Sequence, residues 1–192
     1  MRSAAPGESV CGDAWVALGS GDALTVVVCD GLGHGVLAAA ASKRAVEIAD
    51  THQGVDPGSL LGLVSDGLTG TRGAAVAAAR VDPDRGEVRF AGIGNITASL
   101  YAPGELSARA LISTPGICGV AAGRSRPQVS THPWTAGTAL VMHSDGVHSR
   151  WSLRDWPGSR DHDPTTLAAW VLWQANRRRD DACALVVTGG PR

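Results

Sequence analysis

The sequence is short of the features that mark several large protein classes. It has four cysteines among 192 residues, and no two of them have Cys-x-x-Cys spacing. A zinc site built from thiolates is therefore not predicted. Cys29 and Cys183 stand inside apolar runs, which predicts small side chains of the core.

Long apolar runs and basic stretches are also missing. No run approaches the ~18 residues that a membrane-spanning helix needs, and the N-terminus has no apolar core of a signal peptide. The formal net charge is −1, and the basic run Arg177–Arg179 is followed at once by two aspartates. We expect a cytoplasmic protein that binds neither nucleic acid nor a membrane.

What is present is the composition of a soluble globular protein, with 44% hydrophobic and 18% charged residues. The length suits one compact domain, which we expect to cover residues 1–192. Apolar, β-branched stretches predict strands, and stretches rich in Ala and Leu predict helices. The predicted strands are 23–29, 74–81, 87–91, 96–101, 139–143 and 182–187, and the predicted helices are 36–51, 60–68 and 165–176.

Hairpin-like spacing, as at Asp82–Gly86, and the lack of regular βαβ alternation favour an α+β fold of antiparallel sheets covered by helices. The stretch from Gly104 to Pro133 carries no clear signal of structure. Trp170 and Trp173 lie three residues apart on the last predicted helix, and the default interpretation of both is core packing.

Aspartates recur at the ends of the predicted strands. Asp30 and Asp145 follow buried strands and precede glycine, Asp13 precedes Ala14–Ala17, and the pair Asp180–Asp181 precedes the last strand. A single Asp-Gly is more often a turn, and we interpret Ser65–Gly67 as a helix end or turn. Carboxylates gathered at a sheet rim are costly unless cations pair with them.

Oxygen ligands of this kind suit the hard cations Mg²⁺ and Mn²⁺. Two such ions about 3.5–4 Å apart can hold a phosphate and activate water. The aspartates therefore suggest hydrolysis of a phosphate ester, although residue types alone do not decide it.

The order of the motifs is more specific. The chain carries, in sequence, Cys11–Trp15, Asp30–Gly35, Gly92–Asn95, His143–Gly146 and Arg179–Ala182. In this order they resemble the type-2C metal-dependent protein phosphatases, most of all their bacterial SpoIIE-like branch. Thr71–Ala74 and the Gly-Asn pair at 94–95 are similar to the RsbX-type phosphatases of stress-response pathways. The resemblance runs from about residue 6 to residue 187.

The resemblance implies an αββα sandwich of two antiparallel sheets flanked by helices. It also implies that Asp30 bridges two Mn²⁺ or Mg²⁺ ions and that the Gly31 carbonyl binds one of them. Asp145 and Asp180 would complete the shell of the second ion. Asp13 would act directly or through water, and Asp181 would lie behind the ligands.

Four further residues have open roles. His34 either protonates the leaving oxygen or shapes the glycine loop. Arg72 either contacts phosphate, whose geometry suits guanidinium, or is a surface turn residue. We expect Asn95 to satisfy backbone groups at a turn, and His143 to be packed or to lie behind Asp145.

The predicted function is hydrolysis of phosphoserine or phosphothreonine on a protein. By resemblance the substrate is a phosphorylated STAS-domain regulator, either an anti-anti-sigma factor or a stressosome component. One alternative is a catalytically weak homologue that only binds a regulator. Another is a serine hydrolase using Ser144 and His148, although no Gly-x-Ser-x-Gly motif surrounds Ser144.

Overall fold

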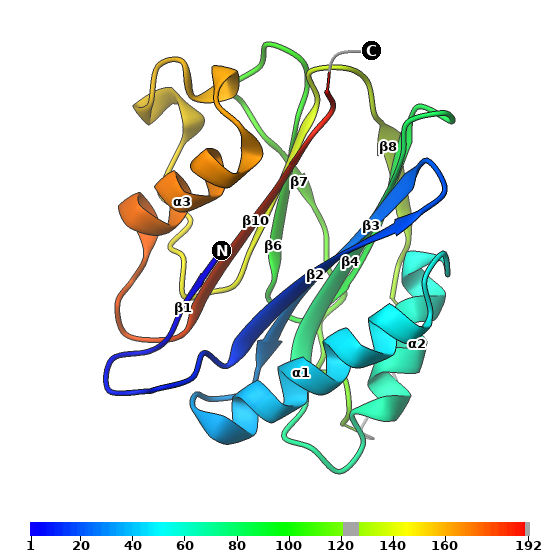
Figure 1. Cartoon of the computed structure of the whole chain (residues 1–192), viewed down its shortest axis with the longest axis vertical. Coiled ribbons are helices and arrows are strands. Elements are labelled where there is room, and N and C mark those ends of the chain that lie inside the picture. Colours follow the sequence, from blue (N-terminus) through cyan, green and yellow to red (C-terminus); the bar gives the residue numbers. More distant parts are fainter. Residues whose placement is uncertain (121–126, 191–192) are drawn as a thin grey trace.

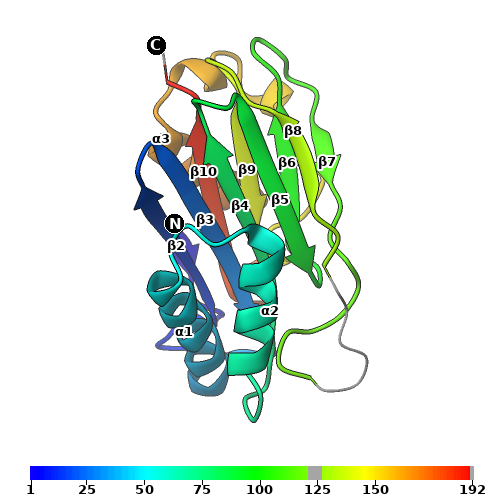
Figure 2. The same cartoon turned by 90° about the vertical axis from the view of Figure 1, so that its right-hand side faces the viewer.

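The computed structural model describes residues 1–120 and 127–190. Two five-stranded antiparallel sheets pack face to face, and helices cover their outer faces (Figures 1 and 2). The α+β αββα sandwich expected from the sequence is confirmed.

The two sheets are assembled from strands that are far apart in the sequence. The first has the order β1-β10-β9-β6-β7 and the second the order β2-β3-β4-β5-β8. The strands of the first sheet are β1 (Arg2–Ser3), β10 (Ala182–Thr188), β9 (Ala139–His143), β6 (Thr97–Tyr101) and β7 (Arg109–Leu111). Those of the second sheet are β2 (Asp13–Ser20), β3 (Ala23–Gly31), β4 (Ala74–Asp82), β5 (Glu87–Ile93) and β8 (Ser130–Pro133).

The helices divide between the two outer faces (Figure 1). α1 (Val36–Thr51) and α2 (Pro57–Gly67) pack on the second sheet, and α3 (Pro164–Ala175) packs on β10 of the first. Two short 3₁₀ turns, η1 (Leu153–Asp155) and η2 (Ser159–Asp161), precede α3.

Two helices begin earlier than the sequence pattern predicts, and the reason is local. Asp56 and Asp163 cap α2 and α3 by accepting hydrogen bonds from the amides of Gly58 and Thr165, and a proline follows each cap. Asp-Pro is a favoured helix start, because the carboxylate accepts a free amide and proline needs none.

The stretch from Gly104 to Pro133, which carries no clear sequence signal of structure, contributes β7 and β8. Residues 121–126 of that stretch lie outside the described residues. The prediction that Trp173 packs in the core is wrong, because 72% of its surface is exposed. Its neighbour Trp170 is half-buried and packs against Trp151 and Trp156.

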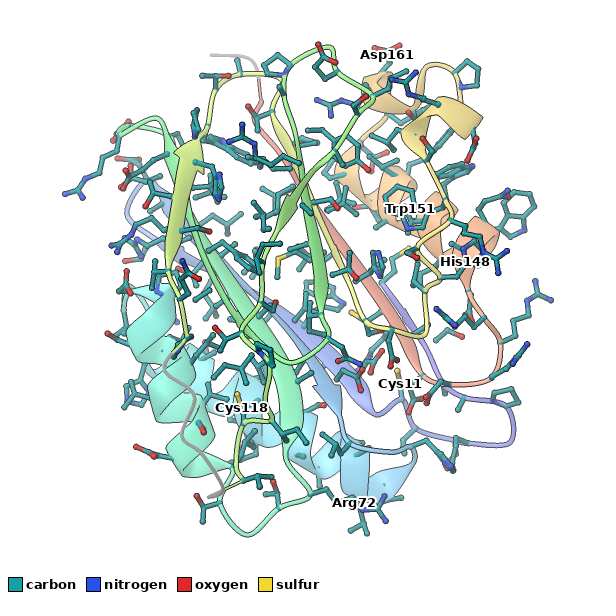
Figure 3. The ribbon with its side chains drawn as sticks, turned by 180° about the vertical axis from the view of Figure 1, so that it is seen from behind. Cys11, Arg72, Cys118, His148, Trp151 and Asp161 are labelled. Carbon is teal, nitrogen blue, oxygen red and sulfur yellow. The ribbon has the colours of Figure 1, made fainter. Side chains whose placement is uncertain are left out.

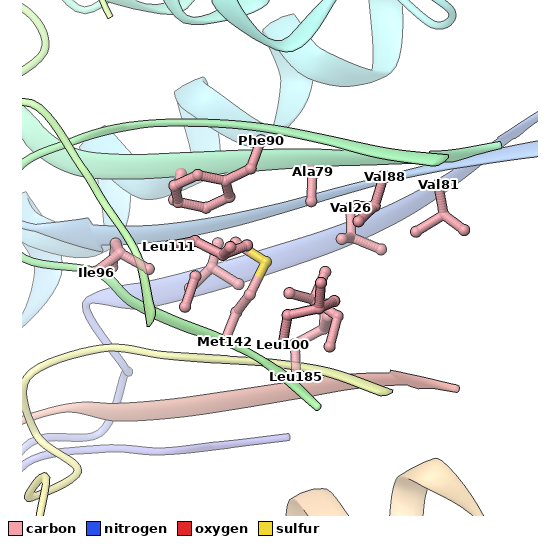
Figure 4. Packing of buried hydrophobic residues seen from close by; sticks show 14 of the residues in the cluster. Val26, Ala79, Val81, Val88, Phe90, Ile96, Leu100, Leu111, Met142 and Leu185 are labelled. Atoms are coloured by element: carbon pink, nitrogen blue, oxygen red, sulfur yellow. The ribbon is translucent and has the colours of Figure 1, made fainter. Parts of the chain in front are cut away.

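The main apolar layer lies between the two sheets (Figure 4). Phe90, Leu140 and Met142 are its largest fully buried side chains, and they come from β5 and β9. Cys29 and Cys183 are buried, as predicted. Among the residues that the structure describes, none forms a helix long and apolar enough to cross a membrane.

Candidate metal centre

Three strands, β3, β9 and β10, point alternate apolar side chains into the layer between the sheets. At one end of this layer, the next side chain in each series is polar. Side chains two residues apart on a strand share a face. Val26 and Val28 of β3 are therefore followed on that face by Asp30. The corresponding polar residues in the other two series are Ser144, after Leu140 and Met142, and Asp181, before Cys183 and Leu185.

The first two carboxylates are brought together by a hairpin. β2 and β3 pair in a register that sets Asp13 directly opposite Asp30. Directly opposed residues have Cβ atoms about 4.5–5.5 Å apart, so like charges there repel. Asp13 is almost completely buried, with 1% of its surface exposed, whereas Asp30 is partly accessible.

We call the end of the layer that carries the five aspartates the carboxylate rim; its residues are Asp13, Asp30, Asp145, Asp180 and Asp181. Asp145 lies two residues beyond the end of β9 and is exposed. Its Oδ2 accepts a hydrogen bond of 2.8 Å from the Nδ2 of Asn95, which comes from the turn after β5. Asn95 was expected to satisfy backbone groups at a turn rather than to serve the site, and its hydrogen bond to Asp145 contradicts the second part of that expectation. The Gly-Asn pair was a signal, but its partner 50 residues away was not readable from the sequence.

Asp180 and Asp181 precede β10 and differ in burial. Asp180 is half-buried, and its Oδ1 accepts a hydrogen bond from the amide of Asp181. The Oδ1 of buried Asp181 accepts one from the amide of Ala5, which fixes the N-terminal segment beside the rim. The Oδ2 of Asp181 is buried and has no hydrogen-bond partner.

Two glycines beside these aspartates are required by the crowding of the rim. A Cβ on Gly146 would overlap the carbonyl oxygen of Asp181, and a Cβ on Gly31 would overlap that of Ala38 in α1. The Asp-Gly pairs at 30–31 and 145–146 are therefore more than turns. They let the strand ends and α1 approach closely enough to gather the carboxylates.

A buried serine connects the two sheets under this rim. The hydroxyl of Ser144 donates a 2.6 Å hydrogen bond to Oδ2 of Asp13 and accepts one from the amide of Cys183. Its neighbour His143 is buried, bonds the Ser144 carbonyl through Nδ1, and packs against Trp151. Packing was one of the two roles expected for His143.

Ser144 is fully buried with its hydroxyl engaged by Asp13, and His148 accepts a hydrogen bond from the amide of Arg150. This arrangement does not form the activated serine–histidine pair that a serine hydrolase needs.

Burial and mutual repulsion disfavour the charged forms of two carboxyls. Burial is the main cause that raises the pKa of Asp13 to about 7, and the carboxylates of Asp181, Asp145 and Asp180 add to it. Burial likewise raises the pKa of Asp30 to about 8, with contributions from the same carboxylates and from Asp13. Such a cluster is stabilised by any cation that binds within it.

The carboxylates fit divalent cations in chemistry, although their side chains do not yet form a closed shell. Across residues 1–120 and 127–190, no three His, Cys, Asp or Glu side chains are arranged to hold an ion. Mutual repulsion keeps such groups apart until a cation draws them together. The donor set nevertheless suits Mg²⁺ or Mn²⁺, which prefer oxygen ligands: Asp181 has an unpartnered buried oxygen, and Asp13 lies opposite Asp30.

The structure places His34 within the loop that follows Asp30, between β3 and α1, and Arg72 beside that loop. His34 is exposed, and its Nδ1 lies 2.6 Å from Oε1 of Glu8, a partner that no sequence signal indicated. The guanidinium of Arg72 lies against Gly33, where a Cβ would come within 2.8 Å of Nη1. The amide of Leu32 bonds the carbonyl of Gly73, which holds the Arg72 turn next to this loop.

The rim lies at one end of the molecule. Figure 3 shows Cys11 and Arg72 toward this end and Asp161 at the opposite end. The sequence-predicted aspartates therefore converge at one end of the sandwich, with Asn95 and Ser144 as supports, while His34 and Arg72 stand at its outer side.

Comparison with known proteins gives consistent matches. A curated relative, the phosphoserine phosphatase RsbX of Bacillus subtilis (strain 168), is 24% identical over 143 residues, which are 74% of this chain and 70% of the relative. A chain solved in work on the bacterial stressosome, described as a modular system adapted to control secondary messenger signalling, is 26% identical. It superposes with a TM-score of 0.88, over 97% of this chain and 95% of that one.

RsbX solved in complex with magnesium superposes with a TM-score of 0.80 at 19% identity, over 97% of this chain and 91% of that one, and so shares the fold. The family model of Stage II sporulation protein E (SpoIIE) matches residues 20–188. That match spans most of the chain and includes the strand ends that carry Asp30, Asp145, Asp180 and Asp181. The chain therefore belongs to the SpoIIE family.

Proposed function

We propose that this chain is a metal-dependent protein serine/threonine phosphatase that hydrolyses phosphoserine or phosphothreonine by direct attack of water on phosphorus. The observation that carries the proposal is the gathering of five aspartates at one rim, with Asp13 opposite Asp30 and the pKa of both raised. Membership of the SpoIIE family and the RsbX relative support it.

Asp30, the Gly31 carbonyl, Asp145 and Asp180 are the groups that would hold two Mn²⁺ or Mg²⁺ ions. Asp13 would be a further ligand, direct or through water, and Asp181 would support the set from behind. Divalent cations, when bound, neutralise phosphate charge and make water a nucleophile near neutral pH.

The chain's own groups prepare this site. Asn95 orients the carboxylate of Asp145 through its 2.8 Å hydrogen bond, and Ser144 orients Asp13 through its 2.6 Å bond. Groups that orient ligands in this way govern metal affinity. The guanidinium of Arg72 is placed to bind phosphate oxygens, and Glu8 holds His34 where it either donates a proton to the leaving oxygen or shapes the loop.

A cysteine-nucleophile mechanism does not suit this chain. Burial raises the pKa of Cys11 to about 11 and that of Cys118 to about 12, and it raises the pKa of Cys29 and Cys183 as well. Thiols of this kind stay protonated near neutral pH and are poor nucleophiles. Hydrolysis without a phosphoenzyme is the chemistry that the carboxylate rim supports.

The proposed substrate is a phosphorylated STAS-domain regulator, such as an anti-anti-sigma factor or a stressosome component. The support is the RsbX relative and the similarity to a chain from stressosome work. The proposal keeps the cytoplasmic location expected from the sequence, in the same compartment as such a regulator.

The test is hydrolysis of p-nitrophenyl phosphate and of a phosphothreonine peptide, with Mn²⁺ and then with EDTA. Wild type is compared with Asp30→Ala and with Asp84→Ala, which alters an exposed aspartate in the hairpin at the far end of β4. We expect activity that needs Mn²⁺, is lost in Asp30→Ala and is retained in Asp84→Ala. A folded wild type without activity on either substrate, or on phosphorylated STAS proteins, would favour a binding module instead.

A further inference from the structure

A pocket of about 600 Å³ opens beside the carboxylate rim. It lies between the N-terminal segment, the start of β2 and one face of α1, and its wall includes Asp13, Cys11 and Arg2. Asp13, which belongs to the rim, also contributes to this wall, so the pocket adjoins the candidate metal centre. A peptide whose phosphate lies at the rim has room to place neighbouring residues here.

The charge of this pocket is opposite to that of the rim. Arg2 and Lys43 are its cationic residues, and Asp13 is its acidic one. Lys43 is the single lysine of the chain, and its side chain is 79% exposed. The guanidinium of Arg2 donates a hydrogen bond of 3.3 Å to the Asp13 carbonyl, which holds that cation at the boundary between pocket and rim.

The position of Lys43 on α1 directs it toward this pocket. Ala39, Lys43 and Val46 line the pocket and are spaced by four and three residues, so they share one helix face. Arg44 is the next residue along α1, about 100° further around the helix, and is not among the lining residues. Both Lys43 and Arg44 lie 3.9 Å from the carboxylate of Glu47, and both side chains are more than half exposed, so Arg44 serves as the matched control.

The pocket also has exposed apolar side chains in its wall. Trp15 and Val10 are 41% and 38% exposed, and Val46 of α1, which also packs against the core on the second sheet, lines the pocket with them. Trp15 projects from β2, which is an edge strand of its sheet. A large exposed aromatic side chain next to cationic groups is typical of protein-binding surfaces.

We propose that this pocket binds the residues next to the phosphorylated side chain of the protein substrate. It selects a segment with an acidic residue, which Lys43 and Arg2 attract, beside an apolar residue that packs on Trp15. This inference rests on the proposed phosphatase function, and it assigns the specificity of that activity to a surface outside the carboxylate rim.

The test compares phosphothreonine peptides of equal length whose flanking residues are aspartate, serine or lysine. The measured quantity is kcat/KM with Mn²⁺ for wild type, Lys43→Glu and the matched control Arg44→Glu. The ratio between two peptides within one variant cancels differences in the folded or metal-loaded fraction. Hydrolysis of p-nitrophenyl phosphate by wild type is measured in parallel, because its absence would count against the proposed function and not against this pocket.

We expect wild type to prefer the aspartate-flanked peptide over the lysine-flanked one by about five-fold, the scale of one exposed charge pair. Lys43→Glu reverses this preference, and Arg44→Glu keeps most of it. In addition, Trp15→Ala abolishes a preference for leucine over glycine in the flank. The proposal is overturned if Lys43→Glu and Arg44→Glu change the ratio equally, or if Lys43→Glu slows all peptides alike.

Discussion

The layer between the two sheets has an apolar interior and a carboxylate rim, and the same strands build both. β3 contributes Val26 and Val28 to the interior and Asp30 to the rim. β10 contributes Cys183 and Leu185 to the interior, and Asp181 precedes it at the rim. The change from one region to the other takes a single two-residue step along each strand.

The two regions differ in what they do to stability. Burial of apolar side chains stabilises the fold by about 25 cal/mol per Å² removed from water. At the rim, burial and neighbouring carboxylates instead disfavour the ionised forms of Asp13 and Asp30. Packing in the interior therefore fixes the register of the strands. That register holds the carboxylates of the rim close together despite their repulsion, where cations can bind them.

The largest expected effect comes from removing the central charge of the rim. Asp30→Asn keeps the shape of the side chain and removes the carboxylate opposite Asp13. We expect loss of Mn²⁺-dependent hydrolysis by about three powers of ten or more, since a lost cation forfeits several kcal/mol of charge stabilisation. Activity is measured on p-nitrophenyl phosphate at saturating Mn²⁺.

Asp30→Asn also tests whether the rim, unlike the interior, lowers the stability of the metal-free fold. Without metal, Asp30→Asn is expected to raise the melting temperature, because it removes a repelled carboxylate. A variant that is inactive and also much less stable than wild type in EDTA would contradict the division of roles between rim and interior. Asp84→Asn, in the exposed hairpin at the far end, is the matched control for the amide substitution.

The second effect is a loss of stability in the interior. Phe90 is fully buried between the sheets, and Phe90→Ala is expected to cost about 3–5 kcal/mol of unfolding free energy. Urea unfolding of the metal-free protein measures it. Activity per folded molecule should stay near that of wild type. A loss of activity well beyond the unfolded fraction would mean that the rim depends on the packing of this side chain.

The interior was largely predictable from the sequence, and the rim only partly. The predicted strand 139–143 and helix 36–51 match β9 and α1 in both bounds, because a short apolar run and a long Ala-rich run are clear local signals. Asp30, Asp145 and the pair Asp180–Asp181 stood out because each lies beside a predicted strand. Their convergence followed from the family resemblance rather than from spacing.

What the sequence did not indicate was the set of partners across the fold. Asn95 reaches Asp145, Ser144 reaches Asp13 and Glu8 reaches His34, over separations of 50, 131 and 26 residues. Such contacts depend on which strand ends lie next to each other in the fold, and local sequence patterns do not show this. Trp173 was misassigned for a related reason, since its spacing from Trp170 could not show that α3 turns this side chain outward.

The third effect is a pH dependence of stability that is expected in EDTA. The folded pKa values of about 7 for Asp13 and about 8 for Asp30 lie above the ordinary value of 3.8. Their stabilising contribution is complete below the ordinary pKa and is lost as the pH rises through the folded values. The melting temperature of the metal-free protein should therefore fall between about pH 5 and pH 8.

The difference between Asp30→Asn and wild type isolates this effect from other titrations. It should widen from pH 5 to pH 8 in EDTA, because only wild type has to ionise Asp30. Saturating Mn²⁺ should restore the melting temperature of wild type at pH 8 and have less effect on the variant. A difference that stays constant across this range would contradict the raised pKa of Asp30.

The smallest effect tests whether the polar residues that hydrogen-bond to the aspartates of the rim affect its affinity for Mn²⁺. Asn95→Ala removes the donor to Asp145 Oδ2 and leaves the carboxylate in place. We expect the Mn²⁺ concentration for half-maximal activity to rise by about ten-fold while the maximal rate changes less, as is usual for groups that orient ligands. Asn95→Asp, which puts a second carboxylate against Asp145, should raise that concentration further unless the added charge becomes a ligand. If both variants bind Mn²⁺ like wild type, Asp145 is oriented by its backbone alone, and Asn95 belongs to the turn.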